Sequence, residues 1–370
     1  MKKILYLMHV DWHWIKQRPH FIAELLPQKF DVTVCTAMTY RKSQLVKNTN
    51  ETDIELRQLF ILPLARFNLI SKINSILIKF QLIRLIANVD IVWITHPKMF
   101  KLVINSLPES TKLVYDCMDD ALEFPRVLSD DMHKTEIFEL EKALINRCNI
   151  IFSSSNYLSN KLKHRYGRQK NIYTVNNAIS LPEYNAIDDS TDILKLEALM
   201  DSITGKKLLY LCTISEWMYF ELITDSVQRF PSITYIFVGP CDIPTPKHER
   251  IIIFGPIKYN NIFRAMNKAD ALIMPFQVNE LIKAVNPVKV YDYIYSCKPA
   301  IVAGYAETAI FEDFIHLYNT PDEYMLKLEL LVTDKLQLKK SNEESLSFIN
   351  KNTWPARVDQ MLTALDSWIT

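Results

Sequence analysis

The sequence predicts an α/β protein built from two parallel sheets in series. Short apolar runs rich in Val, Ile and Tyr alternate with segments of helical pattern along the chain. Each run is too short for a helix and is apolar throughout, as strands buried on both faces are. At roughly 150 residues per domain, a chain of 370 residues has room for two domains, and the pattern supplies one set of strands for each.

The strands occur in two groups. In the first half they are expected at residues 4–8, 32–35, 91–95, 112–115, 150–152 and 172–175. In the second half they are expected at residues 208–211, 233–238, 251–254, 271–274 and 300–302. Asn, Ser and Pro gather near residues 176–182, which indicates a boundary. We therefore expect domains at 1–178 and 179–350, and a final helix at 351–370 that either returns to the first domain or simply ends the chain.

Composition excludes several classes of site. With only 5 glycines, the chain contains no GxGxxG turn, no GxxxxGK[ST] phosphate loop and no GxSxG nucleophile elbow. The balance of 43 basic and 42 acidic residues does not suggest a nucleic-acid-binding protein. Residues 1–178 nevertheless hold 25 Lys and Arg against 17 Asp and Glu, which indicates an anionic partner for this half or ordinary variation in surface charge.

Features related to location indicate a cytoplasmic protein. The 6 cysteines are scattered without a CxxC pair, as in proteins of a reducing compartment. The apolar run at residues 4–8 is too short for a signal peptide, and no stretch of ~20 uncharged apolar residues predicts a transmembrane helix.

The loop after the first strand is rich in side chains that bind ligands. Residues 9–20 contain Asp11, Trp12, Trp14 and Arg18, and the carboxyl end of a strand is where open α/β sheets bind ligands. Aromatic rings beside charged groups suit a sugar or a phosphate-bearing ligand. The alternative is that the two Trp residues anchor the following helix and Arg18 caps it.

Two further strand ends in the first half carry candidate catalytic groups. The strand at 112–115 leads into a carboxylate cluster that includes Asp119 and Asp120, and mutual repulsion can raise the pKa of one of them enough for it to act as a base. Helix capping and metal binding are the alternatives for these carboxylates. His96 follows the strand at 91–95, where a purely structural histidine is the alternative.

The second half contains a predicted anion site. Asn286 and Pro287 suit the N-cap and the first turn of a helix, whose exposed N–H groups bind anions. Lys289 in the first turn can reach a diphosphate, and Asp292 can accept hydrogen bonds from ribose hydroxyls. An ordinary i,i+3 ion pair between Lys289 and Asp292 is the alternative.

The chain resembles bacterial glycosyltransferases of the GT-B fold, of the type found in families 4 and 1. The resemblance spans nearly the whole chain. It rests on the opening WHWIKQRPHFIAELL, on VYDCMDD, on ISEW after the first strand of the second half, on ADALIMPF, on NPVKVYDYIYSCKPAIVAG and on the closing WPARVDQML. It implies two Rossmann-like domains that face a cleft, with the acceptor in the first, the nucleotide sugar in the second, and a last helix that returns to the first.

The resemblance also implies roles for individual residues. Asn286, Val288 and Lys289 would hold the diphosphate and Asp292 the ribose. The nucleobase would lie near Gly255, Pro256 and Ile257, and the diphosphate and sugar would be bordered by Ser215, Glu216 and Trp217. In the first domain the implied catalytic residues are Asp119, Asp11 and His96, with Asp119 as base if the enzyme inverts, and the implied acceptor-binding residues are Trp12, Trp14 and Arg18.

Two positions depart from the family pattern. Eight residues before Asp292 the family has an acid, but this chain has Ala284, and whether Glu280 replaces it is open. A glycine common near the start of the second domain is replaced around Cys212 and Thr213, which puts the approach of the phosphate there in doubt.

The implied function is transfer of a sugar from a nucleotide-diphosphate sugar, with UDP expected first, to a hydroxyl of a glycan or lipid-linked acceptor in surface polysaccharide biosynthesis. No metal and no further cofactor is expected. A GT-B epimerase acting on a nucleotide sugar and a noncatalytic binding or scaffold protein are the alternatives.

Residues 66–89 predict a peripheral contact with the inner face of the cell membrane. Arg66, Lys72, Lys79 and Arg84 interrupt a run of Leu, Ile and Phe that contains no acid, as in helices that lie on an anionic membrane. The alternative is a helix packed on the first sheet with its basic face in water.

Overall fold

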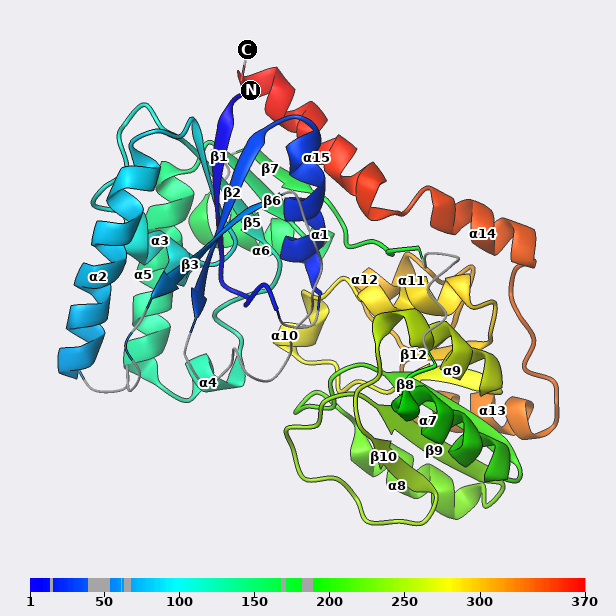
Figure 1. Ribbon diagram of the computed structural model, residues 1–370. Helices are drawn as coiled ribbons and strands as arrows, with labels where there is room; N and C mark the ends of the chain where they lie inside the picture. Colours follow the sequence, from blue (N-terminus) through cyan, green and yellow to red (C-terminus); the bar gives the residue numbers. More distant parts are fainter. Residues whose placement is uncertain are drawn as a thin grey trace. The chain divides into compact units, whose positions relative to one another are not determined.

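A computed structural model of the protein contains two compact units (Figure 1). The structure describes residues 1–13, 16–38, 54–60, 62, 68–167, 171–181 and 189–369. The first unit consists of Met1–Asn177 and Trp354–Thr370, and the second of Ala178–Thr353.

The first unit has a 7-stranded parallel sheet in the order β3-β2-β1-β4-β5-β6-β7. Its strands are β1 (Lys3–Met8), β2 (Asp31–Met38), β3 (Glu55–Phe60), β4 (Ile91–Ile94), β5 (Lys112–Cys117), β6 (Ile150–Ser153) and β7 (Asn171–Thr174). Its helices are α1 (Arg18–Leu25), η1 (Leu26–Gln28), α2 (Asn68–Ile86), α3 (Pro97–Val103), α4 (Pro125–Leu128), α5 (Asp131–Arg147), α6 (Asn156–Tyr166) and α15 (Trp354–Ile369).

The central strands of this sheet are apolar because both of their faces are covered. All four residues of β4 and five of the six residues of β1 are buried. The rings of Tyr6 on β1 and Trp93 on β4 stack with their centroids 5.7 Å apart, and Phe152 on β6 continues the stack at 5.6 Å from Trp93. Aromatic side chains of three strands thus form one face of the core.

The second unit has a 6-stranded parallel sheet in the order β10-β9-β8-β11-β12-β13. Its strands are β8 (Lys206–Leu211), β9 (Ile233–Val238), β10 (Ile251–Phe254), β11 (Ala271–Met274), β12 (Ala300–Ala303) and β13 (His316–Tyr318). Its helices are α7 (Thr191–Ser202), α8 (Phe220–Arg229), η2 (Tyr259–Asn261), α9 (Ile262–Lys268), α10 (Glu280–Lys283), α11 (Val288–Tyr295), α12 (Ala306–Ala309), α13 (Pro321–Val332) and α14 (Asn342–Asn350).

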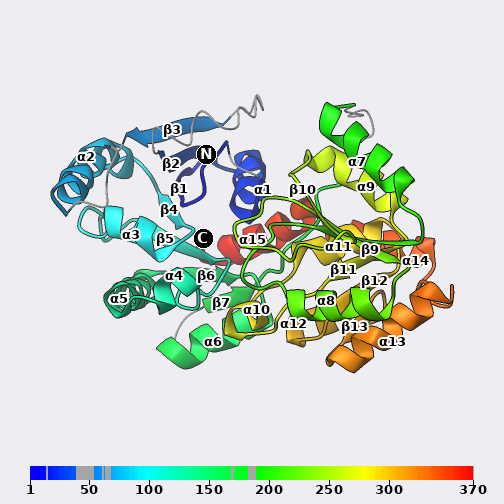
Figure 2. The same cartoon turned by 90° about the horizontal axis from the view of Figure 1, so that it is seen from below.

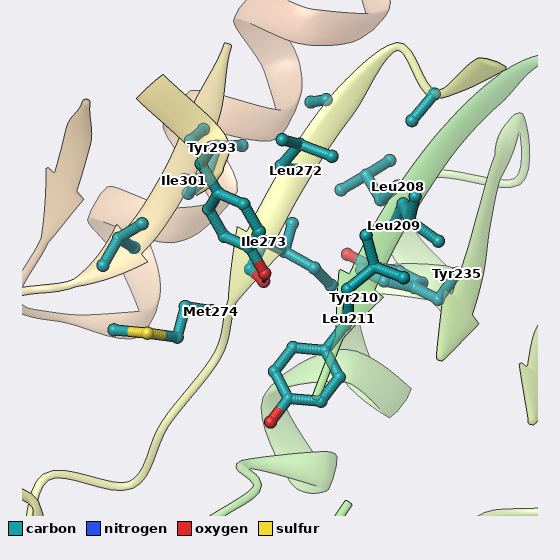
Figure 3. Packing of buried hydrophobic residues seen from close by; sticks show 14 of the residues in the cluster. Leu208, Leu209, Tyr210, Leu211, Tyr235, Leu272, Ile273, Met274, Tyr293 and Ile301 are labelled. Atoms are coloured by element: carbon teal, nitrogen blue, oxygen red, sulfur yellow. Dashed lines mark hydrogen bonds between the residues drawn. The ribbon is translucent and has the colours of Figure 1, made fainter. Parts of the chain in front are cut away.

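The core of the second unit connects the sheet to α11. Figure 3 shows side chains of β8 and β11, among them Leu209 and Ile273, beside Tyr293 of α11. The Tyr293 hydroxyl donates a hydrogen bond to the backbone oxygen of Ile273 at 2.9 Å. This bond fixes α11 against a central strand, so the start of the helix has a defined position.

The last helix, α15, packs on the first unit. The Trp354 ring stacks on Phe21 of α1 with the centroids 5.0 Å apart, and Lys29 forms an ion pair with Asp366. Arg357 Nε donates to the backbone oxygen of Asn177 at 3.4 Å. The chain therefore passes between the units twice, after Asn177 and before Trp354.

None of the helices in the described part of the chain, α2 included, combines the length and the apolar composition needed to cross a membrane.

Candidate functional site

Each sheet has one point at which the order of its strands reverses. In the first unit β1 lies between β2 and β4, and in the second β8 lies between β9 and β11. Neighbouring loops at such a point lead to opposite faces of the sheet, which leaves a crevice outside the carboxyl ends of the strands where ligands bind. The predicted site residues Asp11 and His96 follow β1 and β4, and Ser215–Trp217 follow β8.

The loop after β1 packs closely against the start of α1. Trp12 is buried, and its ring centroid lies 5.5 Å from that of His20 on α1. The Asp11 carboxylate accepts a hydrogen bond from the backbone N–H of His13 at 2.9 Å. For Trp12 this placement favours the anchoring role over direct contact with an acceptor. Trp14 lies outside the described residues.

Arg18 joins three segments of the first unit. It is buried, and its guanidinium donates to both carboxylate oxygens of Asp116 at 2.8–3.1 Å. It also donates to the backbone oxygen of Val175 at 2.7 Å and to Asn177 Oδ1 at 3.3 Å. The helix cap is Gln17, so the alternative that Arg18 caps α1 is wrong. An acceptor could bind Arg18 only if some of these bonds opened, so this geometry supports a positioning role.

Two histidines lie together at the reversal point of the first sheet. The rings of His9, after β1, and His96, after β4, have centroids 5.0 Å apart. His9 Nδ1 lies 2.8 Å from Thr95 Oγ1, and His96 Nδ1 accepts a hydrogen bond from the backbone N–H of Lys98. Partial desolvation lowers the pKa of the half-buried His96 to about 3 and that of His9, although its side chain is partly exposed, to about 4, so both rings are neutral at pH 7.

His9 is absent from the residues that the sequence predicted for the site, and His96 is among them. Each follows a strand, but only the order of the sheet makes β1 and β4 neighbours. His96 also serves as the N-cap of α3, which is the structural role left open for it.

The three carboxylates after the middle of β5 have different surroundings. Asp116 is paired with Arg18. Asp120 is buried and binds Arg165 and Lys161 of α6, with the closest nitrogen–oxygen distances at 2.8 and 2.9 Å. Burial opposes ionisation of Asp120, but these two cations lower its pKa overall. Asp120 Oδ1 also accepts from the backbone N–H of Leu122 at 3.2 Å, within a turn. The N-cap of the next helix, α4, is Phe124, so the alternative that Asp119 or Asp120 caps that helix is wrong.

Asp119 is the unpaired member of this cluster. Among the described residues no cation forms an ion pair with its carboxylate. Burial raises its pKa to about 6, the Arg18 charge opposes the rise and the Asp120 charge adds to it. At pH 7 such a group is mostly ionised yet more basic than an ordinary aspartate, which suits a general base. In the part of the chain that the structure describes, no three His, Cys, Asp or Glu side chains form a group that could hold a metal ion.

In the second unit the loops after β8 and β11 contact each other. The rings of Trp217 and Phe276 lie 6.4 Å apart, and the backbone N–H of Gln277 donates to the Trp217 oxygen at 2.8 Å. Ser215 is buried and Glu216 is exposed. Trp217 is therefore held across the reversal point, beside the end of β11.

Gly239 lets the loops after β8 and β9 approach each other. Its φ of +152° lies in the region that favours glycine, and a Cβ there would lie 2.1 Å from the backbone oxygen of Cys212. The backbone N–H of Ile214 then donates to the oxygen of Pro240 at 2.8 Å. The loop that lacks the family glycine at Cys212 and Thr213 is thus shaped by a glycine that directly follows the neighbouring strand β9. Gly239 was not predicted from the sequence to have this role.

The predicted anion site lies at the start of α11, with one correction. The N-cap is Pro287 and the helix begins at Val288, so the prediction of Asn286 as N-cap is wrong by one residue. Asn286 is fully buried, and its Oδ1 accepts from the Tyr291 hydroxyl at 3.4 Å, so its side chain reaches into the core of the second unit.

Lys289, Asp292 and Tyr259 form a compact polar group. Lys289 Nζ lies 3.1 Å from Asp292 Oδ2 and 5.5 Å from the centre of the Tyr259 ring. The Tyr259 hydroxyl donates to Asp292 Oδ1 at 2.9 Å. Burial acts to lower the pKa of Lys289, but its charge interaction with the buried Asp292 raises it overall. The structure thus contains the i,i+3 ion pair, and it adds Tyr259, which was not predicted as a site residue.

The structure also places the predicted nucleobase loop and the position where the family acid is missing. Gly255, Pro256 and Ile257 follow the edge strand β10 and are exposed or half-buried. Ala284 is fully buried. Glu280 is exposed at the start of α10 and lies 2.7 Å from Lys283 Nζ. The family acid is therefore replaced by a core alanine, and Glu280 takes part in a surface ion pair.

Known proteins resemble this chain in sequence and in fold. No protein-family profile matches the sequence. The chain is 24% identical over 229 residues to TuaH of Bacillus subtilis (strain 168), by its name a teichuronic acid biosynthesis glycosyltransferase. The matched region is 59% of this chain and 56% of TuaH, so the match spans about half of that relative.

Solved structures match the chain over its full length. The sucrose-phosphate synthase of Thermosynechococcus elongatus has a TM-score of 0.73 at 10% identity. The match covers 100% of this chain and 99% of the synthase chain. Anabaena HepE in complex with UDP-glucose has a TM-score of 0.70 at 14% identity and covers 99% and 100%. The chain has the GT-B fold. The fold class predicted from the sequence is confirmed, and so is the resemblance to glycosyltransferases.

Proposed function

We propose that this protein is a glycosyltransferase that moves a sugar from a nucleotide-diphosphate sugar to a hydroxyl of a glycan or lipid-linked acceptor in surface polysaccharide biosynthesis. The similarity to TuaH over 229 residues carries the proposal, because TuaH is named for glycosyl transfer in teichuronic acid biosynthesis. The fold supports it, since HepE has this fold and is described in complex with UDP-glucose.

The donor is assigned to the second unit. Val288 and Lys289 would hold the diphosphate, where the N–H groups of α11 and the Lys289 charge stabilise the negative charge of the leaving group. Asn286, whose side chain is buried, would take part only through its backbone. Asp292 would hold the ribose. Both of its oxygens already accept hydrogen bonds, from Lys289 and Tyr259, so a ribose hydroxyl would replace one of them.

The remaining donor contacts come from loops at the same edge of the sheet. The proposed residues beside the diphosphate and sugar are Ser215, Glu216 and Trp217, and those beside the nucleobase are Gly255, Pro256 and Ile257. UDP is the first candidate nucleotide, since HepE and the trehalose-6-phosphate protein of Escherichia coli are described with UDP or UDP-sugars.

In the first unit Asp119 is proposed as the base of an inverting reaction. Its carboxylate would take the proton of the acceptor hydroxyl while the acceptor oxygen bonds to the anomeric carbon. The bond from that carbon to the diphosphate oxygen breaks, and the nucleoside diphosphate leaves with the electron pair. Asp11 and His96 are assigned to orient the reacting groups, and no metal enters the proposed step.

A thermal-shift screen with UDP, GDP, dTDP, CMP and ADP tests the donor assignment. A nucleotide at 100 times its dissociation constant stabilises the folded protein by about 2.7 kcal/mol, so a clear rise in Tm with one nucleotide is expected. Lys289→Ala should abolish that rise, and Lys283→Ala on neighbouring α10 should keep it. No rise with any nucleotide, or an undiminished rise in Lys289→Ala, would contradict the assignment.

A nucleotide-sugar epimerase is the second candidate. A structure described as a UDP-N-acetylglucosamine 2-epimerase from Listeria monocytogenes matches with a TM-score of 0.55 at 15% identity. Product analysis separates the two, because an epimerase returns the nucleotide still joined to the sugar, whereas a transferase releases it. Nucleotide-sugar binding without turnover with any acceptor would favour a noncatalytic role, which the core alanine at position 284 also allows.

The protein is further proposed to act in the cytoplasm, at the inner face of the cell membrane, where it would meet a lipid-linked acceptor. The support is the basic and apolar composition of residues 66–89, which the structure describes from Asn68 onward.

A further inference from the structure

Helix α2 exposes a row of large apolar side chains. Leu69, Ile73, Ile76, Phe80 and Ile83 are between 38% and 71% exposed. At 3.6 residues per turn, these positions lie within about 40° of one line along the helix. We call them the α2 stripe. A continuous apolar row on a surface helix indicates an interaction surface, because isolated exposed apolar residues would scatter around the helix.

The opposite face of α2 is fixed to the first unit. Ile78, Leu82 and Ile86 are buried there, and the Gln81 side-chain amide exchanges hydrogen bonds of 3.0 and 3.1 Å with the backbone N–H and oxygen of Phe60 on β3. Asn74 does the same with Leu62, at 2.7 and 3.0 Å. Rotating the helix to bury the stripe would break these four bonds, so the stripe is a stable part of the surface.

The position of α2 within the first unit leaves this face uncovered by the described residues. Figures 1 and 2 both show α2 at the outer margin of the unit, beside α3.

Positive charge accompanies the stripe. No acidic residue occurs between Leu56 and Val89, and Lys79 and Arg84 of α2 are basic. Arg57 on β3 is neutralised by an ion pair with Glu55 and adds no charge to this surface. Measured around the helix axis, Arg84 lies about 60° from the centre of the stripe on one side and Lys79 about 80° on the other. Arg84 is exposed and Lys79 half-buried. An apolar centre with cations on both sides suits a helix lying in the interface of an anionic bilayer, where the cations meet lipid phosphates.

We propose that α2 binds flat on an anionic phospholipid surface, with the α2 stripe inserted among the lipids and Lys79 and Arg84 on the phosphates. A second copy of the chain fits this face less well, because a symmetric dimer through α2 would bring cations together without any acid on the helix to pair with them. The proposal deepens the proposed membrane location of the acceptor, but the surface is defined by α2 alone.

Co-sedimentation of the full chain with vesicles tests the proposal without any nucleotide or acceptor. We expect binding to vesicles that contain phosphatidylglycerol, little binding to pure phosphatidylcholine, and weaker binding at high salt. Ile76→Asp with Phe80→Asp should lower the bound fraction at least tenfold. Lys79→Glu with Arg84→Glu should lower it to a similar extent, since each cation near the surface changes binding by about fivefold and each replacement reverses a charge.

Leu326→Asp on α13 is the matched control. Leu326 is also a strongly exposed leucine on a helix, but it lies in the second unit, and its replacement should leave vesicle binding unchanged. Thermal unfolding of each variant shows whether it is folded, as is expected for exposed positions.

Three outcomes would overturn the proposal. They are no binding of the wild-type protein to phosphatidylglycerol vesicles, equal loss in Leu326→Asp, and a concentration-dependent dimer that Phe80→Asp dissociates without any vesicle binding. None of them bears on the nucleotide-binding screen, so a failure here and a failure of the proposed glycosyl transfer are distinguishable.

Discussion

Replacement of Asp119 by Asn should stabilise the protein at neutral pH while abolishing glycosyl transfer. The pKa of Asp119 is raised from 3.8 to about 6 in the folded protein. The folded protein therefore disfavours the ionised form of Asp119. This lowers the free energy of unfolding by its full amount above pH 6 and not at all below pH 3.8. An amide of nearly the same shape is neutral at every pH and removes this cost.

The magnitude follows from the pKa difference. A rise of about two units, at 1.36 kcal/mol per unit, corresponds to about 3 kcal/mol at pH 7. For a unit of this size, each kcal/mol changes Tm by roughly 2–4 °C, so Asp119→Asn should raise Tm by roughly 6–12 °C. The gain should shrink as the pH falls through 6 and disappear near pH 4.

Asp120→Asn is the matched control, because the same substitution at the next residue should have the opposite effect. Arg165 and Lys161 lower the pKa of Asp120, so its carboxylate stabilises the fold at neutral pH. Loss of that charge leaves two cations without their partner and should cost about 3 kcal/mol.

The assay is thermal unfolding of the wild type and both variants between pH 4 and pH 8. A Tm for Asp119→Asn that is unchanged or lower at pH 7, or a gain that does not vary with pH, would refute the raised pKa and with it the argument for a base at this position.

Three more predictions concern other parts of the two units. Arg18→Met should lower stability by about 3–5 kcal/mol because Asp116 stays buried without its cation, and the double variant with Asp116→Leu should recover much of the loss in urea unfolding. Lys289→Gln should weaken nucleotide binding at least tenfold by calorimetry while the protein stays folded, and unchanged affinity would argue against a diphosphate there. Gly239→Ala should lower Tm by several degrees, since its Cβ would clash with a backbone oxygen, whereas Gly255→Ala, where nothing lies within 4 Å, should not.

The sequence determined the fold class because the central strands are buried on both faces, and their apolar runs mark them directly. Two strands lacked that signal. β3 (Glu55–Phe60) and β13 (His316–Tyr318) lie at sheet edges and are largely half-buried or exposed, so their residues are mostly polar or mixed and no strand was predicted at either. Burial on both faces makes a strand recognisable. The other two edge strands, β7 and β10, were predicted because they keep apolar residues, above all the run Ile251–Phe254 of β10, which β3 and β13 lack.

Local spacing also predicted the contacts that stay within one helix. The Lys289–Asp292 pair follows from an i,i+3 separation, and the structure contains it. Its third member, Tyr259, is 33 residues before Asp292 and reaches it only because η2 and α11 pack in the same unit.

Asp119 and Asp120 show what only the tertiary structure decides. They are adjacent and chemically identical in the sequence, so nothing local separates a base from a structural carboxylate. Arg165 and Lys161 of α6 approach Asp120, and Arg18 of α1 is held by Asp116, which leaves Asp119 without an ion pair in the described structure. The pKa of each carboxyl depends on distance to charges and on burial, and both are set by segments far away in the chain.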